Sequence, residues 1–255
     1  MTFNLFDLSG RRALITGSSR GIGLSMAEGL GRAGASVILN ARTVPLLDEA
    51  VAGLRASGID AVSAVFDVTD QPQVVAAIDK IERDAGPIDI LYNNAGIQRR
   101  GPLEEFPVDC WHEIIRANLD SVFYVSQAVV KYMIRRKRGK IVNTCSMTSE
   151  LGRYSIAPYA ATKGAVKMLT KGMCTDWARY NIQVNGIGPG YFETPLNQAL
   201  MDNPEFDAWL KKRTPAGRWG KLEELQGAAI FLASAASDFV NGQILYVDGG
   251  ILATL

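Results

Sequence analysis

Short apolar runs alternate along the chain with longer stretches in which hydrophobic residues recur every three to four positions. The short runs have the length of buried strands, and the longer stretches have the spacing of helices that bury one face. The expected strands are residues 13–16, 36–40, 62–66, 88–92, 140–144, 182–185 and 243–247. The expected helices are residues 21–33, 44–57, 71–85, 107–136, 156–179 and 221–235.

This alternation of strands and helices predicts a fold of the α/β class. Parallel strands joined by helices require right-handed crossovers, which place helices on both faces of the sheet. We therefore expect a single Rossmann-type domain over residues 1–255, with a doubly wound, seven-stranded parallel sheet flanked by helices. Residues 190–220 interrupt the pattern because they are rich in proline, glycine and charge, and we expect them to form a lid over a ligand site.

The composition of the chain argues against several classes of function. Its 255 residues carry a net charge of only +1, which gives no strong field for nucleic acid or an anionic membrane, so neither is expected as a partner. No apolar stretch approaches the ~20 residues that span a bilayer, and residues 1–7 lack the features of a signal peptide. Cys110, Cys145 and Cys174 lie far apart and form no metal-ligand or disulfide pattern, so we expect a reduced, cytoplasmic protein without a metal site.

Tyr159 and Lys163 stand four residues apart in an expected helix and therefore share one of its faces. A free phenol has a pKa of roughly 10 and is a poor base at neutral pH. A neighbouring ammonium favours the phenolate, so we expect Lys163 to lower the pKa of Tyr159. The pair would then serve as a general acid/base for an alcohol or carbonyl oxygen.

A glycine-rich turn directly follows the first expected strand and opens the first expected helix. Its glycines let the backbone approach a pyrophosphate, and the helix N-terminus supplies amide donors. The residues of this turn that we assign to nucleotide binding are Gly17, Ser19, Arg20, Gly21, Ile22 and Gly23. Their spacing is G-x-x-x-G-x-G, whereas a literal G-x-G-x-x-G at residues 29–34 ends the helix, where we assign it to packing and capping.

The end of the second expected strand bears on which dinucleotide is bound. A carboxylate there would bind the ribose 2′-hydroxyl of NAD, but this chain has Asn40 and Arg42. Arg20 and Arg42 are two cations suited to a 2′-phosphate, so the sequence favours NADP(H) without excluding NAD(H). After the third strand, we expect Asp67 and Val68 to contact the adenine amino group.

The fourth expected strand ends in two asparagines, an alanine and a glycine at residues 93–96. We expect Asn94, Ala95 and Gly96 to wall the same cofactor. All of these candidate positions lie at the carboxyl ends of strands, where doubly wound sheets bind their ligands.

Taken together, these motifs resemble those of a classical short-chain dehydrogenase/reductase, and the match covers essentially the whole chain in the family's order. The carriers are Thr16-Gly17-x-x-x-Gly21-Ile22-Gly23, Asn93-Asn94-Ala95-Gly96, Asn118, Ser146, Tyr159-x-x-x-Lys163, Pro189-Gly190 with Thr194, and Val247-Asp248-Gly249-Gly250.

The family resemblance implies a role for each of these side chains. The resemblance implies that Tyr159 is the acid/base and that Ser146 hydrogen-bonds the substrate oxygen. It also implies that Lys163 binds the nicotinamide ribose and lowers the pKa of Tyr159, so both Tyr159 and Lys163 would contact the cofactor. Asn118 would position a water in a proton relay. The residues that would hold the carboxamide and phosphates of the cofactor are Pro189, Gly190 and Thr194.

Within that family, residues 66–70, 95–100, 146–150 and 213–220 resemble the gluconate 5-dehydrogenases. This resemblance implies reversible oxidation of C5 of D-gluconate with NADP or NAD. Gluconate carries a carboxylate, which we expect to pair with Arg99 or Arg100, with Arg153 as a further candidate. We expect Glu150 to accept hydrogen bonds from sugar hydroxyls or to hold a cation near the carboxylate. A homotetramer formed through the long helices, residues 107–136 and 156–179, and the C-terminal strand region is implied by the resemblance alone.

Two other functions stay open at this point. A 3-oxoacyl-carrier-protein reductase, or another carbonyl reductase of the family, would keep the catalytic residues but need a basic surface for an acidic carrier. The net charge of +1 neither supports nor excludes it. A non-catalytic nucleotide-sensing protein would show a broken catalytic set, whereas all four residues are present here: Asn118, Ser146, Tyr159 and Lys163.

Overall fold

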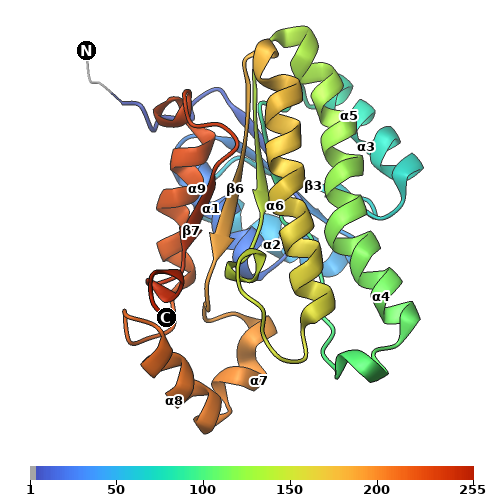
Figure 1. Cartoon of the computed structure of the whole chain (residues 1–255). Helices are drawn as coiled ribbons and strands as arrows, with labels where there is room; N and C mark the ends of the chain where they lie inside the picture. Colours follow the sequence, from blue (N-terminus) through green and yellow to red (C-terminus); the bar gives the residue numbers. More distant parts are fainter. Residues whose placement is uncertain (1–3) are drawn as a thin grey trace.

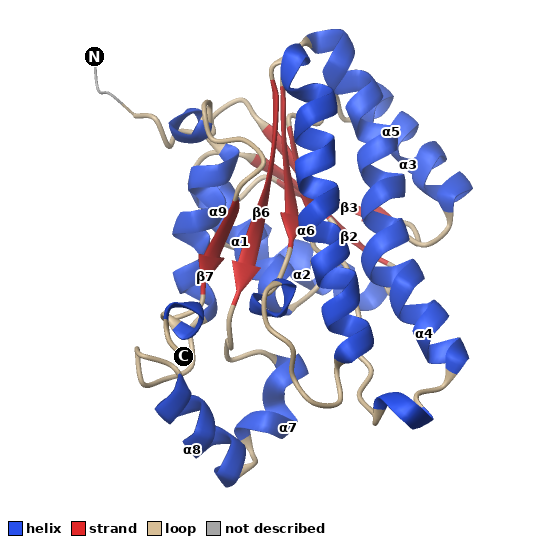
Figure 2. Ribbon diagram, viewed as in Figure 1, coloured by secondary structure: helices blue, strands red, loops and turns tan. Residues whose placement is uncertain are grey.

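A sheet of parallel strands runs through the middle of the molecule, and helices cover both of its faces (Figures 1 and 2). The computed structural model describes residues 4–255; residues 1–3, on which part of the signal-peptide expectation falls, lie outside the described residues. The strands lie in the order β3-β2-β1-β4-β5-β6-β7. Their bounds are β1 Arg12–Ile15, β2 Ser36–Ala41, β3 Ala61–Val65, β4 Ile90–Asn93, β5 Gly139–Thr144, β6 Ile182–Pro189 and β7 Ile244–Val247. The expected seven-stranded Rossmann-type sheet is confirmed.

The helices form one layer on each face of this sheet. Their bounds are α1 Gly21–Arg32, α2 Val44–Ala56, α3 Gln71–Asp84, α4 Val108–Ile115, α5 Ser121–Arg136, α6 Ala157–Trp177, α7 Gln198–Met201, α8 Pro204–Arg213 and α9 Gln226–Ala233. Helices α1, α2 and α9 share one apolar core, and α3, α5 and α6 share the other. Strand β1 contributes to both, with Ala13 and Ile15 facing the first core and Leu14 the second, because side chains alternate along a strand. None of the helices described in residues 4–255 is long and apolar enough to cross a membrane.

The order of the strands reverses between β1 and β4. From β1 the chain first builds outward through β2 to β3, and then returns to place β4 on the other side of β1. The Thr16 amide, just past β1, donates to the Tyr92 carbonyl of β4 at 3.0 Å and closes this junction. In a doubly wound sheet the crevice at such a reversal is where a nucleotide binds, so the ends of β1 and β4 locate the site.

The structure departs from the sequence expectation in one long helix. The single helix expected over residues 107–136 is divided into α4 and α5 by a π-helical segment, Arg116–Asp120. The Asn118 side chain leaves this segment to hydrogen-bond the backbone of Ile97, with Nδ2 donating to the carbonyl at 2.9 Å. A π-helical turn shifts the register of the helix by one residue, and such turns are frequent at functional sites.

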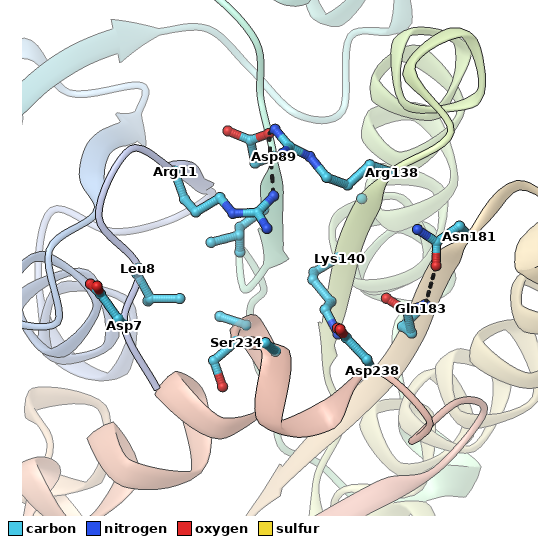
Figure 3. Close-up of a pocket in the computed structure, with 14 residues that line it drawn as sticks. Asp7, Leu8, Arg11, Asp89, Arg138, Lys140, Asn181, Gln183, Ser234 and Asp238 are labelled. Atoms are coloured by element: carbon cyan, nitrogen blue, oxygen red, sulfur yellow. Dashed lines mark hydrogen bonds and ion pairs between the residues drawn. The ribbon is translucent and has the colours of Figure 1, made fainter. Parts of the chain in front are cut away.

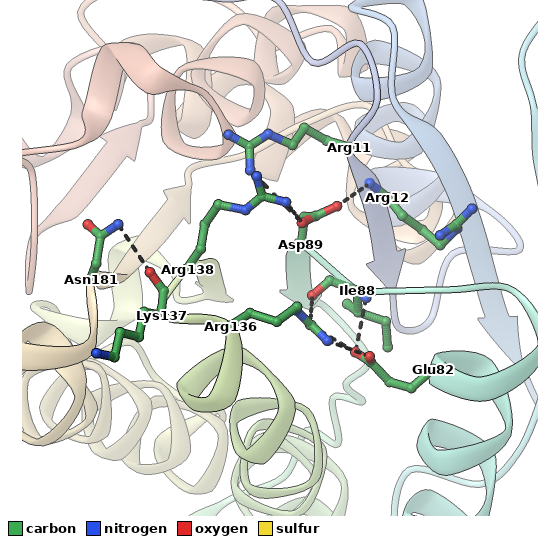
Figure 4. A network of polar contacts seen from close by, with 9 residues as sticks. All are labelled: Arg11, Arg12, Glu82, Ile88, Asp89, Arg136, Lys137, Arg138 and Asn181. Carbon is green, nitrogen blue, oxygen red and sulfur yellow. Dashed lines mark hydrogen bonds and ion pairs between the residues drawn. The ribbon is translucent and has the colours of Figure 1, made fainter.

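The opposite, amino edge of the sheet is closed by ion pairs (Figure 4). Asp89, just before β4, is buried and accepts hydrogen bonds from the Arg12 backbone amide at 3.1 Å and from Arg138 Nη2 at 2.6 Å. Beside it, Arg136 at the end of α5 reaches Glu82 of α3, with Nη1 and Oε2 2.5 Å apart. The basic run at residues 135–138 thus lies at the end of α5, and Arg136 and Arg138 of this run pair with acids of the fold.

A cavity of about 120 Å³ lies beside these ion pairs (Figure 3). Its charged lining includes Arg11, Arg138, Lys140 and Asp238, and Lys140 Nζ lies 2.7 Å from Asp238 Oδ1. Because this cavity borders the starts of β4, β5 and β6, it is remote from the strand ends that carry the catalytic candidates.

Candidate active site

The four candidate catalytic residues come together at the carboxyl edge of the sheet. Ser146 follows the end of β5, Tyr159 and Lys163 lie in the first two turns of α6, and Asn118 lies in the π-helical segment before α5. Thr162 links two of these elements, because its Oγ1 donates to the Tyr159 carbonyl at 2.7 Å and accepts from Asn118 Nδ2 at 3.2 Å. Segments distant in the sequence therefore present their polar groups to one place.

Lys163 is buried, and its ammonium is fixed by the end of β5. Its Nζ donates to the Thr144 carbonyl at 2.6 Å and lies 5.6 Å from the centroid of the Tyr159 ring. Burial lowers the pKa of Lys163 to about 8, because a charge away from water is penalised. The helical spacing of the pair therefore places the two side chains together, as expected from the sequence.

The pKa of Tyr159 corrects the sequence expectation. Burial raises it to about 12, and the neighbouring Ser146 hydroxyl, which acts to lower it, does not compensate. Lys163 was expected to lower this pKa, but its ammonium is directed to the Thr144 carbonyl. At neutral pH the phenol is protonated in this arrangement, so Tyr159 is poised first as a proton donor.

Ser146 is oriented by the residues that follow it. Its Oγ accepts hydrogen bonds from the Thr148 amide at 3.1 Å and from Thr148 Oγ1 at 2.9 Å, which leaves the Ser146 proton free to be donated elsewhere. Ser149 completes a capping box, since its Oγ bonds the Ser146 amide at 3.3 Å, and it also donates to the Lys163 carbonyl at 2.9 Å. Thr148 and Ser149 thus fix Ser146 relative to α6.

Asn118 is fully engaged through its side chain. Its Oδ1 accepts from the Ile97 amide at 2.8 Å, and its Nδ2 donates to the Ile97 carbonyl and to Thr162. The side chain therefore ties the loop after β4 to α6. Any contact of this residue with a water would come from its backbone, in the π-helical segment.

The glycine-rich turn after β1 is packed tightly against the end of β4. A Cβ added at Gly17, which has φ +61°, would lie 2.7 Å from the Ala95 Cα. A Cβ at Gly23 would lie 2.5 Å from Asn94 Nδ2, which donates to the carbonyls of Thr16 and Gly17 at 3.0 Å each. Asn94 and Ala95 therefore hold the turn in place, and only glycine fits at its two contact points.

Asn40 and Val68 also serve the framework rather than the surface of the site. Asn40 is buried, and its Nδ2 donates to the carbonyls of Ala64 and Phe66 at 3.0 Å each. Its Oδ1 accepts from the Gly17 amide at 3.4 Å. Val68 is buried in the core shared by α3, α5 and α6, so its side chain faces away from a ligand. Both were expected at the cofactor; the Asn40 side chain is engaged by the glycine turn and neighbouring carbonyls, and the Val68 side chain by the apolar core.

The same edge of the sheet has the features that a dinucleotide needs. No side chain in the described part of the sequence caps the N-terminus of α1, and a Cβ at Gly21 would meet nothing within 4 Å. The first amides of the helix therefore have no side-chain acceptor in the described residues and are available to an anion. Thr194 Oγ1 is buried and has no hydrogen-bond partner among residues 4–255, and it follows Pro189 and Gly190 at the end of β6.

The remaining cofactor candidates surround this turn. Arg20 directly precedes α1 and is exposed, Ser19 is half-buried in the turn, and Ile22 packs partly on the core of α1. Arg42 follows β2 with 70% of its side chain exposed, and its Nη1 lies 3.3 Å from Asp67 Oδ2. Partial burial acts to raise the pKa of Asp67, but hydrogen bonds from Thr69 and the Arg42 guanidinium outweigh it and lower the pKa.

Of the residues expected to bind substrate, two are engaged elsewhere. Arg99 forms a two-pronged ion pair with Glu113 of α4, with distances of 2.8 and 3.1 Å. Glu150 lies between Lys167 Nζ, at 2.5 and 2.6 Å, and the Tyr246 hydroxyl of β7, at 2.6 Å. The side chains of Arg99 and Glu150, which were expected to contact the sugar acid, are therefore bound by other residues of the protein. The hydrogen bond from Lys167, and then that from Tyr246, lowers the pKa of Glu150.

Arg100 and Arg153 lie close enough for their charges to interact, on two loops that are hydrogen-bonded to each other. The Gly101 amide donates to the Ser155 carbonyl at 3.0 Å and ties the loop after β4 to the loop before α6. The pKa of Arg100 is lowered by burial and by the charge of Arg153. Within residues 4–255 no carboxylate forms an ion pair with either guanidinium.

This geometry agrees with comparison to known proteins. Residues 11–205 match the short chain dehydrogenase family. The chain belongs to this family. The protein is therefore an NAD(P)-dependent oxidoreductase, and the sensor without catalysis is set aside.

Several relatives of this dehydrogenase are similar over their whole length. It is 61% identical over 252 residues to gluconate 5-dehydrogenase of Gluconobacter oxydans, covering 99% of this chain and 98% of the relative. It is 57% identical to 5-keto-D-gluconate 5-reductase of Escherichia coli K12, covering 99% of both chains. A crystal structure of a gluconate 5-dehydrogenase from Burkholderia cenocepacia, in complex with NADP and tartrate, superposes with a TM-score of 0.97 at 61% identity and covers 100% of both chains.

The sequence analysis did not identify three residues that contribute to the site of this dehydrogenase. Thr148 orients Ser146, Thr162 joins Asn118 to the tyrosine helix, and the Tyr191 hydroxyl accepts a hydrogen bond from Arg153 at 2.9 Å. A signal existed for Thr148, because a serine followed by polar residues at the next positions is typical of a capping turn. Thr162 and Tyr191 gave no such signal, because their roles depend on contacts between distant segments.

Proposed function

We propose that this dehydrogenase interconverts D-gluconate and 5-keto-D-gluconate, with NADP(H) preferred and NAD(H) as the second cofactor. The observation that carries the proposal is the full-length similarity, at 61% identity, to the gluconate 5-dehydrogenase of Gluconobacter oxydans. The pair of arginines near Tyr159, without a protein counterion in the described part of the chain, supports a substrate that carries an anionic group.

The catalytic step follows from the contacts of the four central residues. In the direction of ketone reduction, Tyr159 donates its proton to the C5 oxygen, and Ser146, held by Thr148, donates a hydrogen bond to the same oxygen. Lys163, fixed by the Thr144 carbonyl, places a positive charge beside the phenol as it loses its proton. Asn118 holds the loop after β4 against α6. The bound nicotinamide supplies the hydride to C5 or accepts it in the reverse direction.

The proposed cofactor contacts use the turn after β1 and the ends of β2 and β6. The first amides of α1 bind the pyrophosphate, while the exposed Arg20 and Arg42 bind the 2′-phosphate of NADP. Thr194 Oγ1, buried without a partner in residues 4–255, hydrogen-bonds the carboxamide or a phosphate. Asp67 reaches the adenine, and Gly96 walls the cofactor at the end of β4.

The substrate carboxylate is bound by Arg100, with Arg153 beside it. The contact of Arg99 with Glu113 favours Arg100 over Arg99 for this role. A guanidinium binds a carboxylate through two parallel hydrogen bonds, which fixes the orientation of the sugar acid as well as its charge. Glu150 is left out of this proposal because Lys167 and Tyr246 hold it.

The same proposal covers the organisation of the protein. We take the chain as a single domain with residues 190–220 as its substrate lid, and as a homotetramer that pairs through α5 and α6. Phe123 on α5 and Met168 on α6 support such pairing, since both side chains are large, apolar and exposed. The three free cysteines fit a reducing cytoplasm.

A comparison of substrates tests the reaction. The enzyme with NADPH is offered 5-keto-D-gluconate and, separately, an acetoacetyl thioester, and the loss of nicotinamide absorbance is followed. We expect turnover of the keto acid and a decrease in kcat of about 10²–10⁴-fold in Tyr159→Phe, with the affinity for NADPH unchanged. Turnover of the thioester alone would instead support a 3-oxoacyl-carrier-protein reductase. Turnover of neither substrate would refute the proposed reaction.

A further inference from the structure

Two aromatic side chains hold the guanidinium of Arg153. Its Nη1 donates to the Tyr191 hydroxyl at 2.9 Å, and its Cζ lies 4.7 Å from the centroid of the Phe206 ring and 5.9 Å from that of Tyr191. A guanidinium over an aromatic face is attracted by the negative charge of the ring's π-system. Arg153 comes from the loop before α6, whereas both aromatic residues belong to residues 190–220, so this contact joins two separate segments.

The rings that hold Arg153 are themselves fixed by an aromatic cluster. The cluster consists of Tyr191, Phe206, Trp209 and Trp219, with the Tyr191 and Phe206 centroids 5.5 Å apart and their planes at 70°. Trp219 is buried at its base and donates from Nε1 to Asp207 Oδ1 at 2.8 Å. The edge-to-face contacts give Phe206 a defined orientation, so the ring is a rigid support.

Arg153 needs such a support because of its neighbour. Arg100 carries the same charge, and the hydrogen bond from the Gly101 amide to the Ser155 carbonyl, at 3.0 Å, keeps the two loops together. Ser155 has φ +67°, a conformation that a residue with a side chain adopts only where its surroundings enforce it. The two like charges interact unfavourably, so other contacts must hold the Arg153 side chain near Arg100.

The position of this arginine pair is also defined relative to the chemistry. Tyr191 is partly buried, and its pKa is raised by that burial, with opposing effects of Arg153 and Arg100 and a further rise from Tyr159. The arginines, the Tyr191 phenol and the catalytic phenol therefore occupy one neighbourhood. An anion that binds both guanidinium groups would remove their repulsion, and it would lie at the loop that leads directly into the helix of Tyr159.

We propose that Phe206 and Tyr191 are positioning residues that hold Arg153 ready for the carboxylate of the substrate, through the cation–π contact and the hydrogen bond described above. The proposal rests on the sugar-acid substrate of the proposed function and extends it. Carboxylate recognition depends on residues 190–220 through the ring of Phe206, so the aromatic cluster sets selectivity for an anionic substrate.

Binding to a complex that cannot react tests this role. D-Gluconate is titrated calorimetrically into the enzyme saturated with NADPH, in which both ligands are already reduced. Phe206→Leu keeps an apolar side chain but removes the ring face, and we expect the Kd of gluconate to rise about tenfold, as loss of a desolvated cation–π contact implies. Phe206→Tyr retains the ring and should restore the Kd. Trp209→Phe, which changes a member of the cluster but keeps an aromatic ring beside Phe206, is the matched control and should leave the Kd within about twofold.

Two further measurements separate positioning from a general loss of structure. The Kd of NADPH and the kcat for 5-keto-D-gluconate at saturation should stay unchanged in Phe206→Leu, whereas a disordered lid would alter both. An unchanged gluconate Kd in Phe206→Leu, an equal rise in Trp209→Phe, or no gluconate binding to the parent enzyme would overturn the proposal. If the parent enzyme binds gluconate with the expected dependence on Phe206 but does not reduce the keto acid, only the proposed reaction fails.

Discussion

Lys163 is a buried amine whose positive charge is required in the proposed reaction but is disfavoured by its burial. Burial lowers its pKa from 10.5 to about 8, while the pKa of Tyr159 is raised to about 12. The ammonium is therefore present below about pH 8 and lost above it, whereas the phenol keeps its proton throughout that range. We expect kcat/KM for reduction of 5-keto-D-gluconate to decline as the pH rises through about 8, with initial rates measured between about pH 6 and 10.

The variant Lys163→Arg tests whether the loss of the Lys163 charge causes this decline in kcat/KM. Arginine keeps its charge at every pH in the series, so the variant should lose the step near pH 8 even though its overall activity is lower. A decline that persists in Lys163→Arg, or one with a midpoint near the ordinary lysine pKa, would show that a different group controls the rate.

We expect Arg42 to set how strongly the enzyme distinguishes NADPH from NADH. It is exposed and has only a 3.3 Å contact with Asp67, so it can turn to a 2′-phosphate at little cost. We expect Arg42→Ala to raise the KM for NADPH about tenfold or more and to leave that for NADH within about twofold, because only NADPH carries this phosphate. Arg99→Ala is the matched control, since Arg99 is an exposed arginine held by Glu113. Equal losses with both cofactors would contradict the assignment.

At the scale of secondary structure, the regular elements were predictable and the irregular ones were not. The strands are short runs rich in apolar residues, so all seven could be found from hydrophobicity, even the more exposed β3 and β7, although β6 extends to Pro189, beyond the expected end. The π-helical segment at Arg116–Asp120 was not predictable, because one shifted hydrogen bond leaves the spacing of apolar residues nearly unchanged.

Within residues 190–220, the sequence contains a signal for a helix that the prediction of an irregular lid did not use. Their composition suggested an irregular lid, yet the segment contains α7 and α8. Asn203 caps α8 by accepting from the Phe206 amide at 3.0 Å, and Pro204 occupies the first turn. This asparagine–proline pair, followed by basic residues at 211–213, is typical of a helix start and end.

In the candidate site, only the relative positions of residues close together in the sequence could be predicted. Tyr159 and Lys163 could be placed together because a helix of known period connects them. The direction of the Tyr159 pKa could not, because it depends on burial by the whole fold. The choice between Arg99 and Arg100 depends on Glu113, which lies in a different helix and is not distinguished by sequence.

Across the whole molecule, the two edges of the sheet have separate tasks. Candidate catalytic groups lie at the carboxyl edge. The ion pairs around Asp89 lie at the amino edge (Figures 3 and 4). Parallel strands impose this division, because every strand end that faces the nucleotide has its beginning on the far side. Stability and catalysis should therefore respond independently to substitutions at the two edges.

Asp89→Asn tests this independence. Asp89 is only 3% exposed and accepts hydrogen bonds from the Arg12 amide and from Arg138. The asparagine of the variant has no negative charge, and its NH2 group would face one of these two donors, where no hydrogen bond can form. We expect the free energy of unfolding to fall by about 2 kcal/mol in urea denaturation, with kcat and both KM values unchanged. Asp84→Asn is the matched control, since Asp84 forms an exposed pair with Arg83 and should change stability by less than about 1 kcal/mol. A loss of kcat in Asp89→Asn at full occupancy of the folded state would instead mean that the amino edge transmits strain to the site.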